Sequence, residues 1–125
     1  MTNKLEIYKC NICGNVIEVL ISGDGHPVCC GEEMEKLEIK NDIQNSPDLT
    51  EKHSPQIEND TVSVYAHPME DKHYIMFVQT ISQDRNEIKT KYFYPKEQVV
   101  MHTDIDKTGM TARSYCNIHG LYTNK

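Results

Sequence analysis

Cysteine and histidine side chains form two groups along this 125-residue chain. The members of the first group are all cysteines: Cys10, Cys13, Cys29 and Cys30. The second group combines imidazoles with one thiol, and its members are His53, His67, His73, Cys116 and His119. Thiolates and imidazoles bind transition metals, and one soft sulfur among several nitrogens changes how the metal reacts. We therefore expect two metal sites of different chemistry.

The cysteine group has the spacing of a four-sulfur site. Cys10 and Cys13 stand three apart, so one tight turn can present both to one ion, and Gly14 can supply the backbone conformation that this turn needs. Cys29 and Cys30 are adjacent and cannot point the same way from an extended backbone, so we expect an irregular turn there. Four thiolates suit zinc or iron, and the spacing leaves open a structural zinc knuckle or an iron electron-transfer centre.

Context separates the histidines, because a single histidine is more often a hydrogen-bonded or surface residue than a ligand. His26 and His102 have no neighbouring motif and are assigned no metal. Cys116 and His119 are three apart, close enough to bind one ion. Prolines closely follow His53 and His67, which stiffens the loops and reduces the entropy lost on metal binding. Loops at one end of a β-sandwich can converge on one ion although they are distant in sequence.

Composition limits the size of the core and the class of partner. Hydrophobic residues make up 38% of the chain, which has no Trp and two Phe. The net charge of −6 argues against general nucleic-acid binding. No secretory leader and no apolar run of about 18 residues is present, so we expect neither export nor a membrane span. Five cysteines without a leader favour metal binding over disulfides, in a reducing compartment, and we expect the cytoplasm.

The elements that must position these ligands read as short strands. Alternating or continuous apolar segments at about ten-residue spacing, separated by turn residues, predict a β-sandwich after residue 50. The expected strands cover residues 61–66, 74–81, 88–94, 98–103 and 111–116, with an earlier strand at 16–21 that forms a hairpin closing on the cysteines. We expect residues 1–38 to form a metal domain, 39–50 a polar linker, and 51–125 the sandwich. No segment predicts a helix.

Five motifs give the chain a family resemblance. The pattern Cys-x-x-Cys…Cys-Cys-Gly-x-x-Met, from Cys10 to Met34, resembles desulforedoxin. It is followed by Glu-Lys-His-x-Pro, His-Pro-Met, His-Tyr-Ile and Cys-Asn-x-His-Gly. Together these motifs resemble, in order and over nearly the whole chain, the desulfoferrodoxins, the two-iron class of superoxide reductase.

The resemblance implies an all-β fold, with a small desulforedoxin-like domain followed by an immunoglobulin-like β-sandwich. It also implies a rubredoxin-like iron at the four N-terminal cysteines, where zinc can replace it. The ligands implied for the second iron are four equatorial imidazoles and one axial thiolate: His53, His67, His73, His119 and Cys116. Glu51 would approach the open sixth position in the oxidised state, and Lys52 would stand at its mouth.

The implied reaction is the one-electron reduction of superoxide to hydrogen peroxide. A rubredoxin-like protein would supply the electron, and the chain would form a homodimer. One departure is clear: the family often has Trp where this chain has Leu121-Tyr122 and Met76-Phe77. The competing interpretations are a non-catalytic iron electron carrier, a zinc-bound interaction module and a metal hydrolase.

Overall fold

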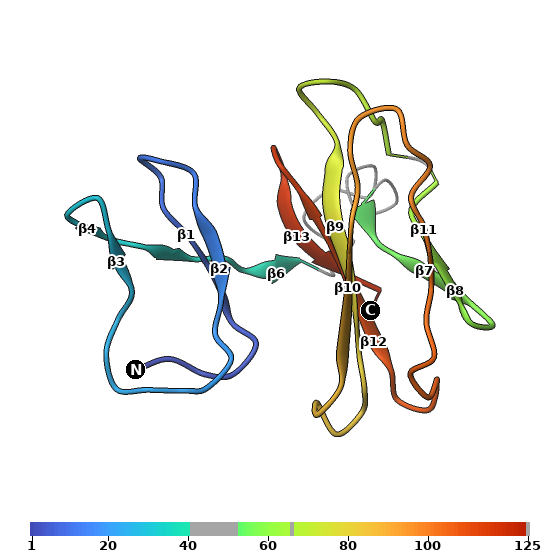
Figure 1. Cartoon of the computed structure of the whole chain (residues 1–125), viewed down its shortest axis with the longest axis horizontal. Coiled ribbons are helices and arrows are strands. Elements are labelled where there is room, and N and C mark those ends of the chain that lie inside the picture. Colours follow the sequence, from blue (N-terminus) through green and yellow to red (C-terminus); the bar gives the residue numbers. More distant parts are fainter. Residues whose placement is uncertain (41–52, 66, 125) are drawn as a thin grey trace. The chain divides into compact units, whose positions relative to one another are not determined.

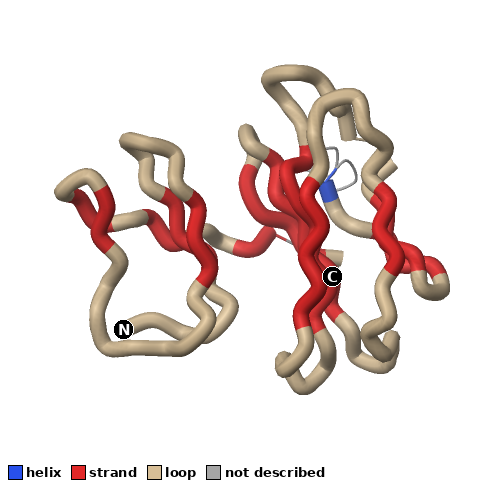
Figure 2. Tube along the Cα trace, viewed as in Figure 1, coloured by secondary structure: helices blue, strands red, loops and turns tan. Residues whose placement is uncertain are grey.

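The computed structural model describes residues 1–40, 53–65 and 67–124. It divides the chain into two compact units, Met1–Glu38 and Ile39–Lys125. In the described part, all thirteen elements with assigned bounds are β-strands (Figure 1). Among the described residues, His53 alone has a helical assignment, drawn in blue in Figure 2. The same residues contain no helix with the length and hydropathy needed to cross a membrane.

The first unit consists of short strands on either side of the cysteine turns. Its strands are β1 (Ile7–Lys9), β2 (Val16–Glu18), β3 (Val28–Cys29), β4 (Glu32–Glu33) and β5 (Glu35–Lys36). A three-stranded sheet has the order β2-β1-β5, and β3 pairs with β4 as a separate hairpin. The first cysteine pair begins directly after β1, and the second pair stands at the end of β3 (strands labelled in Figure 1). The two hairpins bring both pairs together.

The buried interior of this unit is small and partly made of sulfur. Tyr8, Cys10 and Met34 form its cluster, with Val19 and Cys29 packed against them. A unit of this size buries little apolar surface, and such domains usually need a metal or a disulfide for stability. The cysteine cluster is therefore placed to stabilise the unit as well as to bind an ion.

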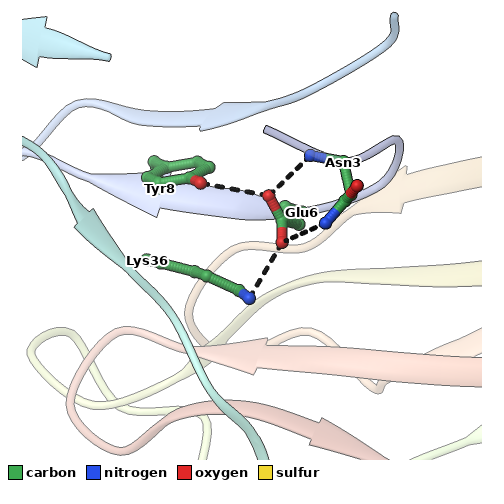
Figure 3. Close-up of polar contacts among 4 residues, drawn as sticks. All are labelled: Asn3, Glu6, Tyr8 and Lys36. Carbon is green, nitrogen blue, oxygen red and sulfur yellow. Dashed lines mark hydrogen bonds and ion pairs between the residues drawn. The ribbon is translucent and has the colours of Figure 1, made fainter. Parts of the chain in front are cut away.

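A carboxylate joins three segments of the first unit (Figure 3). Glu6 accepts hydrogen bonds from the backbone N–H of Asn3 at 2.8 Å and from the Tyr8 hydroxyl at 3.0 Å, and it pairs with Lys36 Nζ at 2.8 Å. Lys36 first, and then the Asn3 N–H, lower the pKa of Glu6 to about 2. The ionised carboxylate thus ties the N-terminal segment to β1 and β5.

The second unit is a β-sandwich. Its strands are β6 (Ile39–Lys40), β7 (Gln56–Glu58), β8 (Thr61–Ser63), β9 (Ile75–Ile81), β10 (Ile88–Tyr92), β11 (Val100–His102), β12 (Thr111–Cys116) and β13 (Gly120–Thr123). One sheet has the order β10-β9-β12-β13-β6 and the other β11-β8-β7. Buried side chains from both sheets form one core: Val62, Val64, Ile75, Val78, Phe93, Val99, Met101, Ile105, Met110, Ala112 and Cys116. The all-β class, with a small metal domain before a sandwich, is confirmed.

Each segment expected as a strand of the sandwich contains one, and β8, β10 and β11 are shorter than the expected 61–66, 88–94 and 98–103. The strand expected at 111–116 has those bounds as β12, and β9 begins one residue later than expected. β7 and β13 were not predicted, because each is short and the glycine that begins β13 is typical of a turn.

β6 lies at the start of the expected linker, residues 39–50. Ile39 and Lys40 pair in parallel with Leu121 and Tyr122 of β13. A pairing between segments some eighty residues apart has no local sequence signal. Residues 41–50 lie outside the described part of the chain.

Candidate metal centres

The four N-terminal cysteines form one cluster. Their sulfur atoms all lie within 4.8 Å of one another. Cys13 Sγ is 3.5 Å from Cys29 Sγ, and Cys29 Sγ is 3.9 Å from Cys30 Sγ. Cys10 is buried, whereas Cys13 and Cys30 are exposed. The set has the donor number and chemistry of a tetrahedral zinc or iron–sulfur site.

The turns that carry these cysteines use positive φ angles. Gly14 has φ +86° and Gly31 has φ +78°, values that favour glycine. Cys30 has φ 55°, which few side chains adopt. This left-handed residue lets adjacent cysteines reach the same point, so the irregular turn predicted at Cys29 and Cys30 is confirmed.

Electrostatics within the sulfur cluster favour a bound cation. The backbone N–H groups of Cys13 and Ile12 point at Cys10 and lower the pKa of its thiol to about 6. The neighbouring sulfurs, Cys13 first and then Cys29, raise the pKa of Cys30 to about 12. Cys10 therefore forms a thiolate readily, whereas the neighbouring sulfurs keep Cys30 protonated. A bound metal cation favours the thiolate form of a cysteine, so the four residues fit a metal site.

The second group also converges, from five separate points on the sandwich. Three histidines come shortly before strands: His53 before β7, His73 before β9 and His119 before β13. His67 follows β8, and Cys116 is the last residue of β12. One donor atom from each lies within 4.8 Å of all the others. His53 Nε2 is 3.0 Å from His67 Nε2 and 3.2 Å from His119 Nδ1, and Cys116 Sγ is 3.8 Å from His119 Nδ1.

The ring nitrogens of His67 and His73 are placed for metal binding. His67 Nδ1 is 2.6 Å from the Pro68 carbonyl oxygen, so it carries the proton and leaves the Nε2 lone pair facing the cluster. Burial first, and then the nearby His53, lower the pKa of His67 to about 4, which keeps the ring neutral near pH 7. His73 Nε2 is buried and has no hydrogen-bond partner. A metal ion would satisfy this nitrogen, so the group fits a metal.

Cys116 lies at the end of β12, where the strand changes register. The pairing with β9 shifts between Tyr115 and Cys116, and such irregularities redirect a side chain. Cys116 is completely buried, and burial raises the pKa of its thiol. The backbone N–H groups of His119 and Ile118, and then the charge of Lys40, act in the opposite direction. These groups are the ones that would set how strongly a bound thiolate donates.

His53 is fixed by packing and by its own backbone. Its side chain is 0% exposed, and its ring stacks on Tyr122 with a centroid distance of 4.4 Å and an angle of 16° between the planes. The Ser114 hydroxyl donates a hydrogen bond to the His53 carbonyl. Tyr122 occupies a region where the family often has Trp, so an aromatic ring still covers this ligand.

Asn117 positions His73 from the opposite strand end, a role that the sequence analysis missed. Its Oδ1 accepts a hydrogen bond from the Tyr74 N–H at 3.0 Å, and its Nδ2 donates to the Lys72 carbonyl at 3.0 Å. Both neighbours of His73 are therefore attached to one side chain. An Asn between two ligands in a turn is a recognisable signal, because Asn side chains bond readily to backbone groups.

Access to the mixed cluster is uneven. His53, His67 and Cys116 are buried, whereas His73 and His119 are partly exposed. Solvent therefore contacts part of the His73 and His119 residues, although the Nε2 atom of His73 is itself buried. Glu51 and Lys52, the two residues assigned a catalytic role from the resemblance, lie outside the described residues.

Comparison with known proteins gives the family. The model described as "Desulfoferrodoxin, N-terminal domain" matches residues 2–37, and the model described as "Desulfoferrodoxin" matches residues 45–125. A desulfoferrodoxin homolog from Archaeoglobus fulgidus is 38% identical over 128 aligned residues, which cover 98% of each chain.

Two solved structures are similar in fold. The superoxide reductase from Treponema pallidum has a TM-score of 0.68 at 18% identity and covers 98% of both chains. A variant of the superoxide reductase (neelaredoxin) from Ignicoccus hospitalis has a TM-score of 0.50 at 27% identity, covering 63% of this chain and 81% of that one. The cysteine cluster and the mixed cluster fit the two iron centres expected from the motifs. The chain belongs to the desulfoferrodoxin family.

Proposed function

We propose that the protein is a superoxide reductase, which converts superoxide, one electron and two protons to hydrogen peroxide. The observation that carries this proposal is the convergence of four imidazoles and one thiol within 4.8 Å, with two of the imidazoles partly exposed. A neelaredoxin-type superoxide reductase with 27% identity supports the same assignment.

We propose that five side-chain atoms bind an iron ion in the sandwich. They are Nε2 of His53, His67 and His73, Nδ1 of His119 and Sγ of Cys116. A redox-active iron there would supply the electron for superoxide. Four neutral imidazoles leave most of the positive charge of such an ion uncompensated, which favours binding of an anion. The Cys116 thiolate adds electron density, as thiolate ligands do in haem enzymes, and the N–H groups of Ile118 and His119 moderate it.

We propose that Lys52 attracts the substrate and that Glu51 approaches the iron in the oxidised state. With a net charge of −6 the protein as a whole repels superoxide, so capture needs a local cation.

Lys52→Ala is expected to slow the second-order reaction about tenfold at low salt and to flatten its ionic-strength dependence, measured by pulse radiolysis. Lys89→Ala, on the exposed part of β10, makes the same change in net charge and should leave both quantities unchanged. Glu51→Ala should alter the ferric visible spectrum.

The cysteine cluster is proposed to hold a second iron, bound by Cys10, Cys13, Cys29 and Cys30, that zinc can replace. It would stabilise the first unit and accept electrons from a rubredoxin-like donor.

We further propose that residues 1–38 and 51–125 act as separate metal domains, and that the protein works in the cytoplasm as a homodimer. Size-exclusion chromatography with light scattering tests the dimer, and electron transfer from reduced rubredoxin tests the donor.

The proposal is tested by metal analysis, visible spectra and reactivity on one preparation. We expect iron, a charge-transfer band from the thiolate, a spectral change with azide, and stoichiometric hydrogen peroxide from superoxide. Azide distinguishes the alternatives, because a pure electron carrier has no open position for it. A colourless protein with zinc in both sites would instead indicate an interaction module. Iron without any reaction with superoxide would exclude the proposed activity.

A further inference from the structure

Lys40 lies against the mixed cluster from the edge strand β6. Its Nζ donates a hydrogen bond to the His119 carbonyl oxygen at 2.7 Å. The amino group also lies 5.5 Å from the centroid of the Tyr122 ring. A Cβ atom on Gly120, which has φ +91°, would be 3.8 Å from Nζ, so the amino group rests over a residue with no side chain. The Lys40 amino group therefore contacts the His119 carbonyl and the Tyr122 ring.

These contacts connect the cation to the ligands on both sides. His119 is itself a member of the cluster, and Tyr122 stacks on the ring of His53. The charge of Lys40 also favours the anionic form of the Cys116 sulfur. The parallel backbone pairing of Lys40 with Tyr122 places the residue beside β13, and the hydrogen bond to the His119 carbonyl holds its amino group there.

We propose that Lys40 is a positioning and tuning residue of the mixed cluster: its hydrogen bond orients His119, and its charge raises the reduction potential of the bound metal. This inference rests on the proposed iron site. A fixed cation stabilises the state that carries more negative charge, and the reduced site carries one unit more than the oxidised one. It also weakens electron donation by the thiolate. Lys40 would therefore favour the ferrous form, the one that can reduce superoxide.

Three variants at this position separate the charge from the hydrogen bond. Lys40→Gln keeps a donor and removes the charge, Lys40→Met removes both and keeps an apolar stem, and Lys40→Arg keeps both. At a fixed ambient potential we expect the ferric-to-ferrous ratio to rise about tenfold in the Gln and Met variants, a shift of about 59 mV for a one-electron couple. The Arg variant should remain near the unmodified protein. The measurement is a spectroelectrochemical titration of the iron-loaded protein.

Lys91→Met is the matched control. Lys91 also donates to a carbonyl, that of Val100 at 3.3 Å, and lies 5.3 Å from an aromatic centroid, that of Phe93. The substitution removes the same charge and the same kinds of contact, and the contacts described for Lys91 involve no residue of the cluster. The potential of this variant should not change.

The outcomes separate this inference from the proposed function. An unchanged potential in Lys40→Gln, with the charge-transfer band intact, would overturn the role of the charge. An equal shift in Lys91→Met would overturn its local origin. A protein without a thiolate-to-iron band would remove the proposed iron site, and this inference with it. Lys40→Gln keeps a polar donor group at this position and provides the decisive measurement if Lys40→Met fails to fold.

Discussion

The two clusters differ in how the chain brings their ligands together. The sulfur cluster draws on residues 10–30, in two turns of one small unit. The mixed cluster draws on residues 53–119 and needs both sheets of the sandwich. Two of the four cysteines are exposed, whereas His53 and Cys116 are completely buried. We therefore expect the sulfur cluster to need its bound ion in order to keep its geometry. The geometry of the mixed cluster depends on the folded sandwich.

The cores of the two units support this contrast. The first unit buries a cluster of three residues, one of which is the ligand Cys10. The corresponding hydrophobic cluster of the sandwich has eleven described residues, one of which is the ligand Cys116. Metal binding energy is folding energy where no site exists beforehand. We therefore expect the first unit, and not the second, to need its metal in order to fold.

The largest expected effect is a difference in superoxide reduction between variants of Cys116, in the mixed cluster, and Cys13, in the sulfur cluster. Cys116→Ser should remove the thiolate charge-transfer band and lower the rate of superoxide reduction by at least about 100-fold, beyond the loss typical of altering an outer partner of a ligand. Cys13→Ser is the matched variant in the other site. It should bleach the sulfur-bound iron and leave the reaction with superoxide unchanged. Visible spectroscopy measures the absorption bands, and pulse radiolysis measures the rate of superoxide reduction. Equal losses of activity in the two variants would contradict the expected difference between the sites.

Metal removal should affect the units unequally. After chelation, amide protons of β1 and β2 are expected to lose protection against hydrogen exchange by about 100-fold relative to those of β9 and β12. The reason is that the sandwich core remains when its ion is absent. Hydrogen exchange followed by mass spectrometry resolves the two segments. Uniform loss across the chain would show that the sandwich also depends on metal.

The next effect concerns the geometry of the mixed cluster. Asn117→Ala should weaken metal binding at that cluster by about tenfold or more, because both backbone neighbours of His73 lose their anchor. Asn124→Ala also removes an Asn oxygen that accepts a backbone N–H, that of Ala112 at 3.1 Å, but away from the ligands. Competition with a chromogenic chelator gives both affinities. Equal affinities in the two variants would assign Asn117 a general structural role.

The smallest effect concerns the carboxylate of the first unit. The pKa of Glu6 lies near 2, below its ordinary value of 4.5. The carboxylate therefore contributes stability above pH 4.5 that is lost as the pH falls through about 2. Glu6→Gln should lower the melting temperature of the metal-loaded first unit by a few degrees at pH 7, and the difference should shrink on acidification towards pH 2. Glu35→Gln, an exposed change on β5, should show neither behaviour.

Local sequence signals predicted the structure best. The spacing of Cys10 and Cys13, and the adjacency of Cys29 and Cys30, predicted the sulfur cluster and its irregular turn. The apolar run before residue 81 predicted β9. The mixed cluster needed the combined motifs, because no single histidine carries enough information to be assigned a metal.

Contacts between distant segments escaped prediction. β6 and β13 pair across some eighty residues, and neither has a strand pattern of useful length. The roles of Lys40 and Asn117 depend on such contacts. Lys40 donates to the backbone carbonyl of His119, and Asn117 donates to that of Lys72.

Residue type and spacing alone determined the donor chemistry of this protein: thiolates in two close pairs, and imidazoles with one thiolate. Side-chain identity decides which ions can be bound, and this holds in any conformation. Only the tertiary structure decided which ring nitrogen faces the cluster, which ligands are buried, and which cation lies behind them. These features depend on strand register and on hydrogen bonds between remote backbone groups, and they exist only once the sheets have formed.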